Sequence, residues 1–154
     1  MITNPKSDVD AKAAYITRLL ESGYDAAKVT NSPADITAVK GGETYYYEIK
    51  FTRQDEKYFG AATLTEWIAA LENEDHFKFV VAFQRNEYWE FHEYSPEEFM
   101  QFSYVPPFKV YFNVAVGGGK DTSVRKKSRT AKLTRERVRL MSELYAHFRD
   151  YNAV

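Results

Sequence analysis

Hydrophobic and polar positions repeat with two different periods along the first half of the chain, and these periods predict an ordered series of helices and strands. Residues 8–22 carry apolar side chains at helical spacing and are followed by Gly23, so we expect a helix that ends there. Residues 24–31, 34–39 and 44–52 are rich in β-branched and aromatic residues. Because Gly41-Gly42 separates the last two segments, we expect a first strand and then a β-hairpin.

The second half of the chain continues the alternation of helix and strand. We expect a helix over about 62–71, with Leu64, Trp67, Ile68 and Leu71 on one apolar stripe. Residues 77–85 form a nearly continuous apolar run, which is typical of a strand covered on both faces. A partner strand is expected over 88–94, a short helix over 96–102, a further strand over 108–116 and a last helix over 133–151 with Thr134 as its N-cap.

The order of these elements sets the fold class. A helix, three strands, a helix and further strands predict an α/β or α+β layered domain, with a mixed central sheet flanked by helices. Additional C-terminal strands and a basic C-terminal helix follow. At 154 residues the length favours a single domain. We expect a core domain over 1–119, and a basic linker and helix over 120–154 packed on that same domain.

Composition limits the setting in which the protein works. Hydrophobic residues make up 44% of the chain and charged residues 28%, which is typical of a globular protein. No apolar run approaches the roughly 18 residues of a membrane-spanning helix, so no membrane partner is expected. The first residues lack the order of a secretory signal and the chain has no cysteine, and both features favour a cytoplasmic location.

The net charge of −1 conceals a strong asymmetry along the chain. Residues 120–154 carry ten basic and four acidic side chains, a balance of +6, which leaves −7 for residues 1–119. A basic segment of this kind favours contact with a polyanion such as nucleic acid, although a solvated basic helix explains it equally well. The residues we expect to contact phosphates are Arg125, Lys126, Lys127, Arg129 and Lys132.

The hairpin carries charged residues where a purely structural strand would carry valines. Pairing outward from Gly41-Gly42 places Asp35 opposite Glu48, and Lys50 lies on the same face as Glu48. Opposed residues have Cβ atoms roughly 5 Å apart, a distance at which two carboxylates repel by about 3 kcal/mol at an effective dielectric near 20. A divalent cation such as Mg²⁺ or Mn²⁺ removes that conflict. Lys50 would then lie beside the attacking water or the developing charge of a phosphate, which suits hydrolysis of a phosphodiester.

These residues resemble the signature of the PD-(D/E)xK nuclease superfamily, in Pro33-Ala34-Asp35 followed by Glu48-Ile49-Lys50. The resemblance covers roughly residues 8–85 and is greatest to the branch of Holliday-junction resolvases and restriction-endonuclease-like proteins, which have an αβββαβ core. It implies that Asp35, Glu48 and the Ile49 carbonyl bind the metal and that Lys50 is the catalytic lysine. The implied function is a Mg²⁺-dependent endonuclease acting on DNA, with RNA as the other candidate substrate and a homodimer left open.

The chain departs from that family at its first helix. Many members have a glutamate there, at the position that Ala13 occupies here. Asp10 is the candidate substitute, although a helix-capping role explains it as well, and Gln54 is a candidate for orienting water. The missing glutamate supports an alternative function, in which a catalytically inactive member of the fold serves as a DNA-binding or protein-interaction module.

Overall fold

The structure is a computed structural model, and it describes residues 7–54, 56–105, 109, 112, 114–119 and 132–151. The chain divides into two compact units, residues 1–103 and 104–154, and each is described by itself. None of the helices in the described ranges combines the length and the apolar character needed to cross a membrane.

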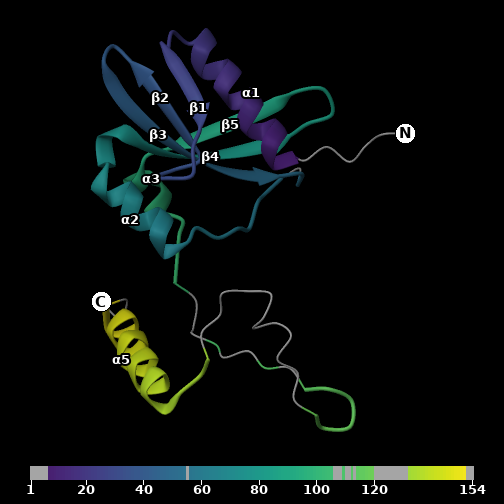
Figure 1. The fold of residues 1–154 in the computed structure, drawn as a ribbon, viewed down its shortest axis with the longest axis vertical. Coiled ribbons are helices and arrows are strands. Elements are labelled where there is room, and N and C mark those ends of the chain that lie inside the picture. Colours follow the sequence, from purple (N-terminus) through teal and green to yellow (C-terminus); the bar gives the residue numbers. More distant parts are fainter. Residues whose placement is uncertain are drawn as a thin grey trace. The chain divides into compact units, whose positions relative to one another are not determined.

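The first unit contains the predicted series of elements in the predicted order (Figure 1). Three helices and five strands follow one another as α1 Ser7–Glu21, β1 Ala26–Val29, β2 Ile36–Lys40, β3 Glu43–Thr52, α2 Leu64–Glu72, β4 Phe77–Gln84, β5 Trp89–Tyr94 and α3 Pro96–Met100. A single 3₁₀ turn, Glu74–His76, lies between α2 and β4. The order therefore reads αβββαβ and then adds one strand and one short helix.

The strands form one mixed sheet in the order β1-β2-β3-β4-β5. β3 and β4 are parallel because α2 makes the crossover between them, whereas every other pair of neighbours is antiparallel. This arrangement confirms the predicted layered fold with a mixed central sheet. β4 lies between β3 and β5 and is buried over most of its length, as its continuous apolar run predicted.

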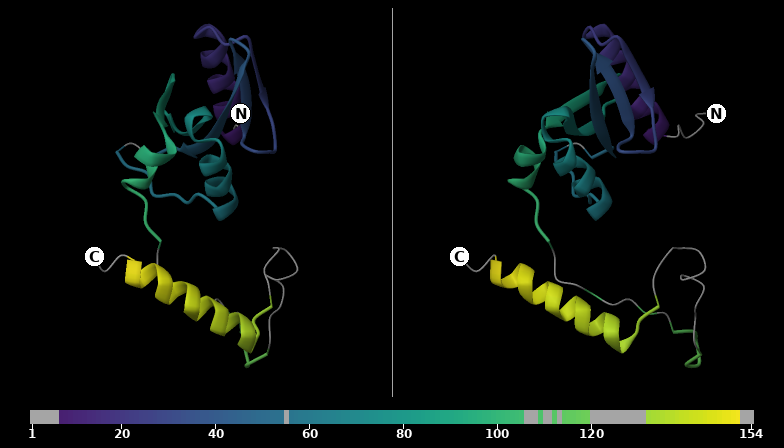
Figure 2. Two further views of the ribbon diagram at one scale, coloured as in Figure 1. Left: turned by 90° about the vertical axis from the view of Figure 1, so that its left-hand side faces the viewer. Right: turned by 60° about the vertical axis from the view of Figure 1, so that its left-hand side comes forward.

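The helices cover the two faces of the sheet separately (Figures 1 and 2). On one face, Tyr15 and Leu19 of α1 pack in a core cluster with Tyr47 and Ile49 of β3. On the other face, Ala69 and Ala70 of α2 pack with Phe77 and Phe79, and Phe99 of α3 adds to this cluster. Because side chains alternate along β3, its odd-numbered aromatic and aliphatic residues face α1, whereas its even-numbered residues face α2.

The predicted apolar stripe of α2 is partly buried only at Trp67, whose ring packs against Phe79 and Phe99. Leu64 is 76% exposed, and Ile68 and Leu71 are each 48% exposed. The buried face consists instead of Ala69 and Ala70, since small side chains let the helix approach the aromatic rings of β4 closely. Burial here follows the space available above the sheet rather than the hydrophobicity of the helical stripe.

The described part of the second unit contains one helix, α5 Arg135–Tyr151. Thr134 caps it as predicted, because the Arg137 N–H donates to Thr134 Oγ1 at 3.2 Å. Four residues of the strand expected over 108–116, namely 108, 110, 111 and 113, lie outside the described residues. Within them, Val114 forms only an isolated bridge, and the Ala115 N–H donates to the Gly119 carbonyl at 2.8 Å in a turn.

Candidate metal and phosphate site

The β2–β3 hairpin has the predicted register. Lys40 pairs with Glu43, and each step outward keeps that register as far as Ile36 and Tyr47. The bend is made by Gly41 and Gly42, whose φ values of +59° and +82° lie in the region that favours glycine. The next step outward places Asp35 beside Glu48, so the two carboxylates meet as the sequence indicated.

Asp35 and Glu48 are tied to each other through the backbone. The Ile49 N–H donates to Asp35 Oδ2 at 2.9 Å, and the Asp35 N–H donates to Glu48 Oε2 at 3.3 Å. Only 7% of Glu48 is exposed. Both side chains line one cavity of about 450 Å³, whose walls are Asn31, Ser32, Pro33, Ala34, Thr63, Thr65, Glu66, Ile68, Ala69 and Glu72. A cavity of this size accommodates a ligand as large as a phosphate group with its flanking sugar.

Each acid has a lysine partner. Lys50 Nζ lies 3.5 Å from Glu48 Oε1 and 2.6 Å from Glu66 Oε2, so the predicted catalytic lysine is at the site. Lys12 Nζ of α1 lies 2.9 Å from Asp35 Oδ1 and 3.0 Å from Asp8 Oδ2. Lys12 thus reaches the hairpin acids from α1, whereas Lys50 belongs to β3 of the hairpin itself.

The electrostatics of the site disfavour ionisation of Glu48. Burial and then the charges of Asp35 and Glu66 raise the pKa of Glu48 from 4.5 to about 7, against the opposing effect of Lys50 and of the hydrogen bond from the Asp35 N–H. The predicted repulsion between the hairpin carboxylates is therefore present, and Glu66 adds to it. A nearby cation would favour the charged form of Glu48.

A count of charges shows what the site lacks. Within the described part of the chain, Asp8, Asp35, Glu48 and Glu66 are joined by ion pairs to two lysines, Lys12 and Lys50. When all six groups are charged, the cluster carries 4 − 2 = 2 uncompensated negative charges, which is the charge that one divalent cation neutralises. Carboxylate oxygens are the ligands that Mg²⁺ prefers, so the residues present fit such an ion. Among the described residues, however, no group of three or more acids or histidines is already arranged to hold one.

Three charged residues of this cluster were not predicted, Asp8, Lys12 and Glu66. Glu66 is the third residue of α2, where its carboxylate also accepts the Thr63 N–H at 3.0 Å while the Thr63 hydroxyl accepts the Glu66 N–H. The sequence Thr63-Leu-Thr-Glu66 is the pattern of this capping box and could have identified the residue. Lys12 carries no comparable local signal, because its partner Asp35 is 23 positions further along the chain.

Other predicted site residues do not join the cluster. Asp10 is exposed on α1, and Lys12 rather than Ala13 or Asp10 is the residue of that helix that reaches Asp35. Gln54 is exposed at the end of β3, and it contributes a backbone N–H to Thr52 Oγ1 at 3.1 Å. Its side chain is not part of the cavity wall.

The basic residues predicted to contact phosphates belong to the second unit. Arg125, Lys126, Lys127 and Arg129 lie outside the described residues. Lys132 is exposed just before α5, and its carbonyl accepts a hydrogen bond from the Arg137 guanidinium.

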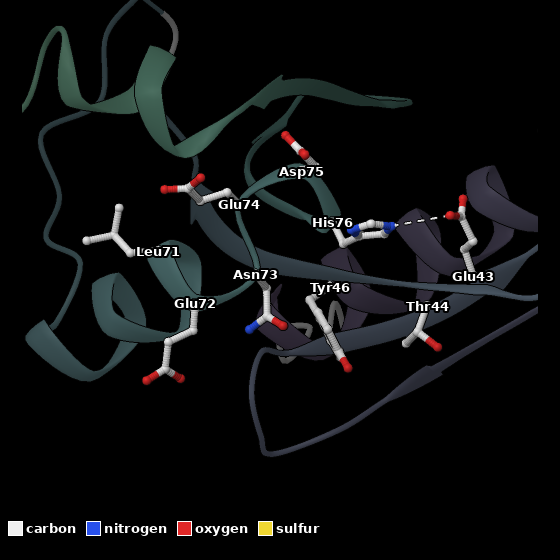
Figure 3. A pocket seen from close by; sticks show the side chains of 9 residues that line it. All are labelled: Glu43, Thr44, Tyr46, Leu71, Glu72, Asn73, Glu74, Asp75 and His76. Carbon is white, nitrogen blue, oxygen red and sulfur yellow. Dashed lines mark ion pairs between the residues drawn. The ribbon is translucent and has the colours of Figure 1, made fainter.

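A second hollow, of about 480 Å³, lies at the other end of β3 (Figure 3). Its lining is mostly acidic and polar, with Glu43, Thr44, Tyr46, Leu71, Glu72, Asn73, Glu74, Asp75 and His76. His76 Nε2 lies 3.8 Å from Glu43 Oε1, whereas Leu71 and Glu72 point away from that pair (Figure 3). Because its acids diverge, this hollow offers no convergent set of ligands.

A family model described as protein NO VEIN, C-terminal, matches residues 11–93. The matched segment runs from the first turns of α1 into β5 and includes Lys12, Asp35, Glu48, Lys50 and Glu66. Comparison with curated proteins and with solved structures gave no match.

Proposed function

The chain belongs to the family of the C-terminal domain of protein NO VEIN, and from the site within that domain we propose that it is a Mg²⁺-dependent endonuclease of the PD-(D/E)xK type acting on DNA. The observation that carries the proposal is the convergence of Asp35, Glu48 and Glu66 on one cavity, with Lys50 in contact with the last two. The αβββαβ order of the elements agrees with the fold that this type of nuclease has.

Asp35 and Glu48 are the residues that would hold the ion. Their backbone hydrogen bonds fix both carboxylates against the hairpin, so the ligands are positioned before a cation arrives. When bound, Mg²⁺ supplies Lewis-acid activation of water and neutralisation of phosphate charge. The Ile49 carbonyl remains our proposed further ligand.

Lys50 would act on the phosphate and on the attacking water. Its ammonium is held by Glu66 at 2.6 Å and by Glu48 at 3.5 Å, and only 15% of its side chain is exposed. A lysine fixed in this way stabilises negative charge that develops on a phosphate oxygen or on a deprotonated water. We assign Glu66 the role of a positioning residue, because it touches the lysine and not the bond to be cut.

The substrate is proposed to be DNA on the basis of the charge distribution. Residues 1–119 carry a net charge of −7, so the acidic core alone would repel a polyanion. The basic segment with Arg125, Lys126, Lys127, Arg129 and Lys132 supplies the opposite charge and is our proposed phosphate-binding segment. Competition of a labelled DNA duplex with matched RNA and single strands tests this choice, and preferential displacement by RNA would reverse it.

The experiment that tests the activity is cleavage of plasmid DNA in Mg²⁺ or Mn²⁺ by the full chain. We expect Glu48→Ala and Lys50→Ala to abolish cleavage while circular dichroism still shows a folded protein. Glu87→Ala is the matched control, since Glu87 is an exposed acid in the turn between β4 and β5. Undiminished cleavage by the purified Glu48→Ala, Lys50→Ala double variant would refute the proposal.

A second candidate function is a non-catalytic module of the same fold that binds DNA or protein. The observation that favours it is the Lys12–Asp35 pair, which already neutralises one proposed metal ligand. Calorimetric titration with Mn²⁺ separates the two candidates. The nuclease requires heat of binding in the wild type that is lost in Asp35→Asn, whereas the module requires none in either protein.

A further inference from the structure

Lys12 holds the oxygen of Asp35 that a metal ion would need. Of the two carboxylate oxygens, Oδ2 already accepts the Ile49 N–H at 2.9 Å, while Oδ1 lies 2.9 Å from Lys12 Nζ. The Lys12 side chain is only 17% exposed, although α1 is a surface helix. Its ammonium is therefore built into the site rather than extended into solvent.

Lys12 also has a second carboxylate within reach. Asp8, one turn earlier on α1, lies 3.0 Å from the same ammonium, and its side chain is 61% exposed. Burial would lower the pKa of Lys12, but its hydrogen bonds with Asp35 and Asp8 outweigh that effect and raise it. The lysine thus keeps its charge at neutral pH, and it can leave Asp35 without losing every partner.

Two cations at one carboxylate oxygen repel each other, so binding of one weakens binding of the other. An ammonium at hydrogen-bonding distance from Oδ1 occupies the direction from which a metal ion would bind and repels its charge. The Glu48 side of the site has no equivalent obstacle at short range, because Lys50 is 3.5 Å from Glu48 and is held at 2.6 Å by Glu66. Lys12 is the closer competitor.

We propose that Lys12 is an internal competitor for the divalent cation, which pairs with Asp35 when the site is empty and moves to Asp8 when the cation binds. Lys12 thereby sets the concentration of cation that the site requires. This inference rests on the proposed function, since it assumes that Asp35 is a metal ligand. It assigns a role to a side chain of the first helix where the resemblance led us to expect an acid.

Titration calorimetry of the full chain with Mn²⁺ tests the competition directly. Lys12→Met removes the ammonium and keeps the length of the side chain, so we expect Mn²⁺ to bind at least about fivefold more tightly, the factor that matches loss of one partly buried ion pair. Lys28→Met is the matched control, because Lys28 is an exposed lysine on β1, and it should leave the affinity unchanged. Lys12→Arg keeps the charge and should bind Mn²⁺ with the affinity of the wild type.

Asp8→Asn supplies an independent test on an exposed residue, so that the conclusion does not depend on the folding of the Lys12 variants. With its alternative partner gone, Lys12 stays on Asp35, and Mn²⁺ should bind more weakly than in the wild type. Unchanged or weaker binding in a folded Lys12→Met protein, alongside Mn²⁺ binding in the wild type that Asp35→Asn abolishes, would overturn this inference and leave the proposed function intact. Absence of Mn²⁺ binding in both the wild type and Lys12→Met would overturn both.

Discussion

Replacement of Glu48 by glutamine gives the sharpest test of the electrostatics of the hairpin. Glutamine keeps the size of the side chain and keeps an oxygen that can accept the Asp35 N–H, but it removes the charge. Burial and the neighbouring charges of Asp35 and Glu66 raise the pKa of Glu48 from 4.5 to about 7 in the folded protein. The folded state consequently binds a proton at Glu48 more tightly than the unfolded chain does.

The sign and size of the effect follow from that difference. The stability that Glu48 contributes is fully present below pH 4.5 and is lost as the pH rises to about 7, because ionisation is harder in the folded state. A difference of about 2.5 pH units corresponds to about 3 kcal/mol. Since small domains have free energies of unfolding of about 5 to 15 kcal/mol, a loss of this size is readily measured.

The assay is urea unfolding of the wild type and Glu48→Gln between about pH 4.5 and about pH 8, followed by the difference between their free energies of unfolding at each pH. Every other titrating group is common to both proteins, so the difference isolates Glu48. We expect the wild type to lose about 3 kcal/mol relative to Glu48→Gln across this range. Glu87→Gln, at an exposed acid, is the control and should track the wild type.

A difference that stays constant with pH would refute the reasoning. It would mean that Lys50 and the Asp35 N–H compensate the charge of Glu48 fully, and that no uncompensated negative charge remains for a cation to neutralise. The measurement needs no metal, so it examines the electrostatic premise separately from cleavage and from Mn²⁺ binding.

The core and the helix cap give three further predictions, each measured by urea unfolding. Tyr15→Phe removes the hydroxyl that donates to Glu93 Oε1 at 2.5 Å, and it should lower the free energy of unfolding by about 1 to 3 kcal/mol. An unchanged free energy of unfolding would show that this hydrogen bond is not formed in solution. Thr63→Ala removes the hydroxyl that accepts the Glu66 N–H, and it should lower the free energy of unfolding by about 1 kcal/mol. Thr63→Ser keeps a hydroxyl at this position and should retain most of that stability. Phe79→Ala removes a fully buried ring and should lower the free energy of unfolding by about 3 to 5 kcal/mol. A decrease below about 1 kcal/mol would contradict the packing of this face.

Local pairing explains why the sequence predicted the hairpin and its acids. A two-glycine bend determines the register of the strands it joins, and the register determines which side chains meet, so Asp35 and Glu48 follow from a count outward from Gly41 and Gly42. The order of helices and strands was predicted for a similar reason. The spacing of apolar residues that marks a helix or a strand is set by residues close together in the sequence. These predictions needed no knowledge of how the helices pack.

Helix packing accounts for what the sequence did not reveal. The predicted stripe of α2 contained Leu64, Trp67, Ile68 and Leu71. Only Trp67 of these packs against the core, and Ala69 and Ala70 are the buried residues of the helix beside Phe77 and Phe79. The rotation of a helix above a sheet depends on the shapes of both surfaces, and periodicity along one segment describes only one of them. Partners contributed by helices to the site were missed for the same reason.

The two helices bring opposite charges to the hairpin, and this changes how the departure from the nuclease pattern is understood. The first helix provides Lys12, which directly precedes Ala13, the position at which a glutamate was expected, and the second helix provides Glu66 beside Lys50. Four carboxylates thus line the cavity, those of Asp35 and Glu48 from the hairpin and those of Glu66 and Glu72 from α2. A site that had simply lost an acid would have one negative charge fewer, whereas this one keeps two more carboxylates than lysines. The absence of an acid at Ala13 is therefore no argument against cation binding.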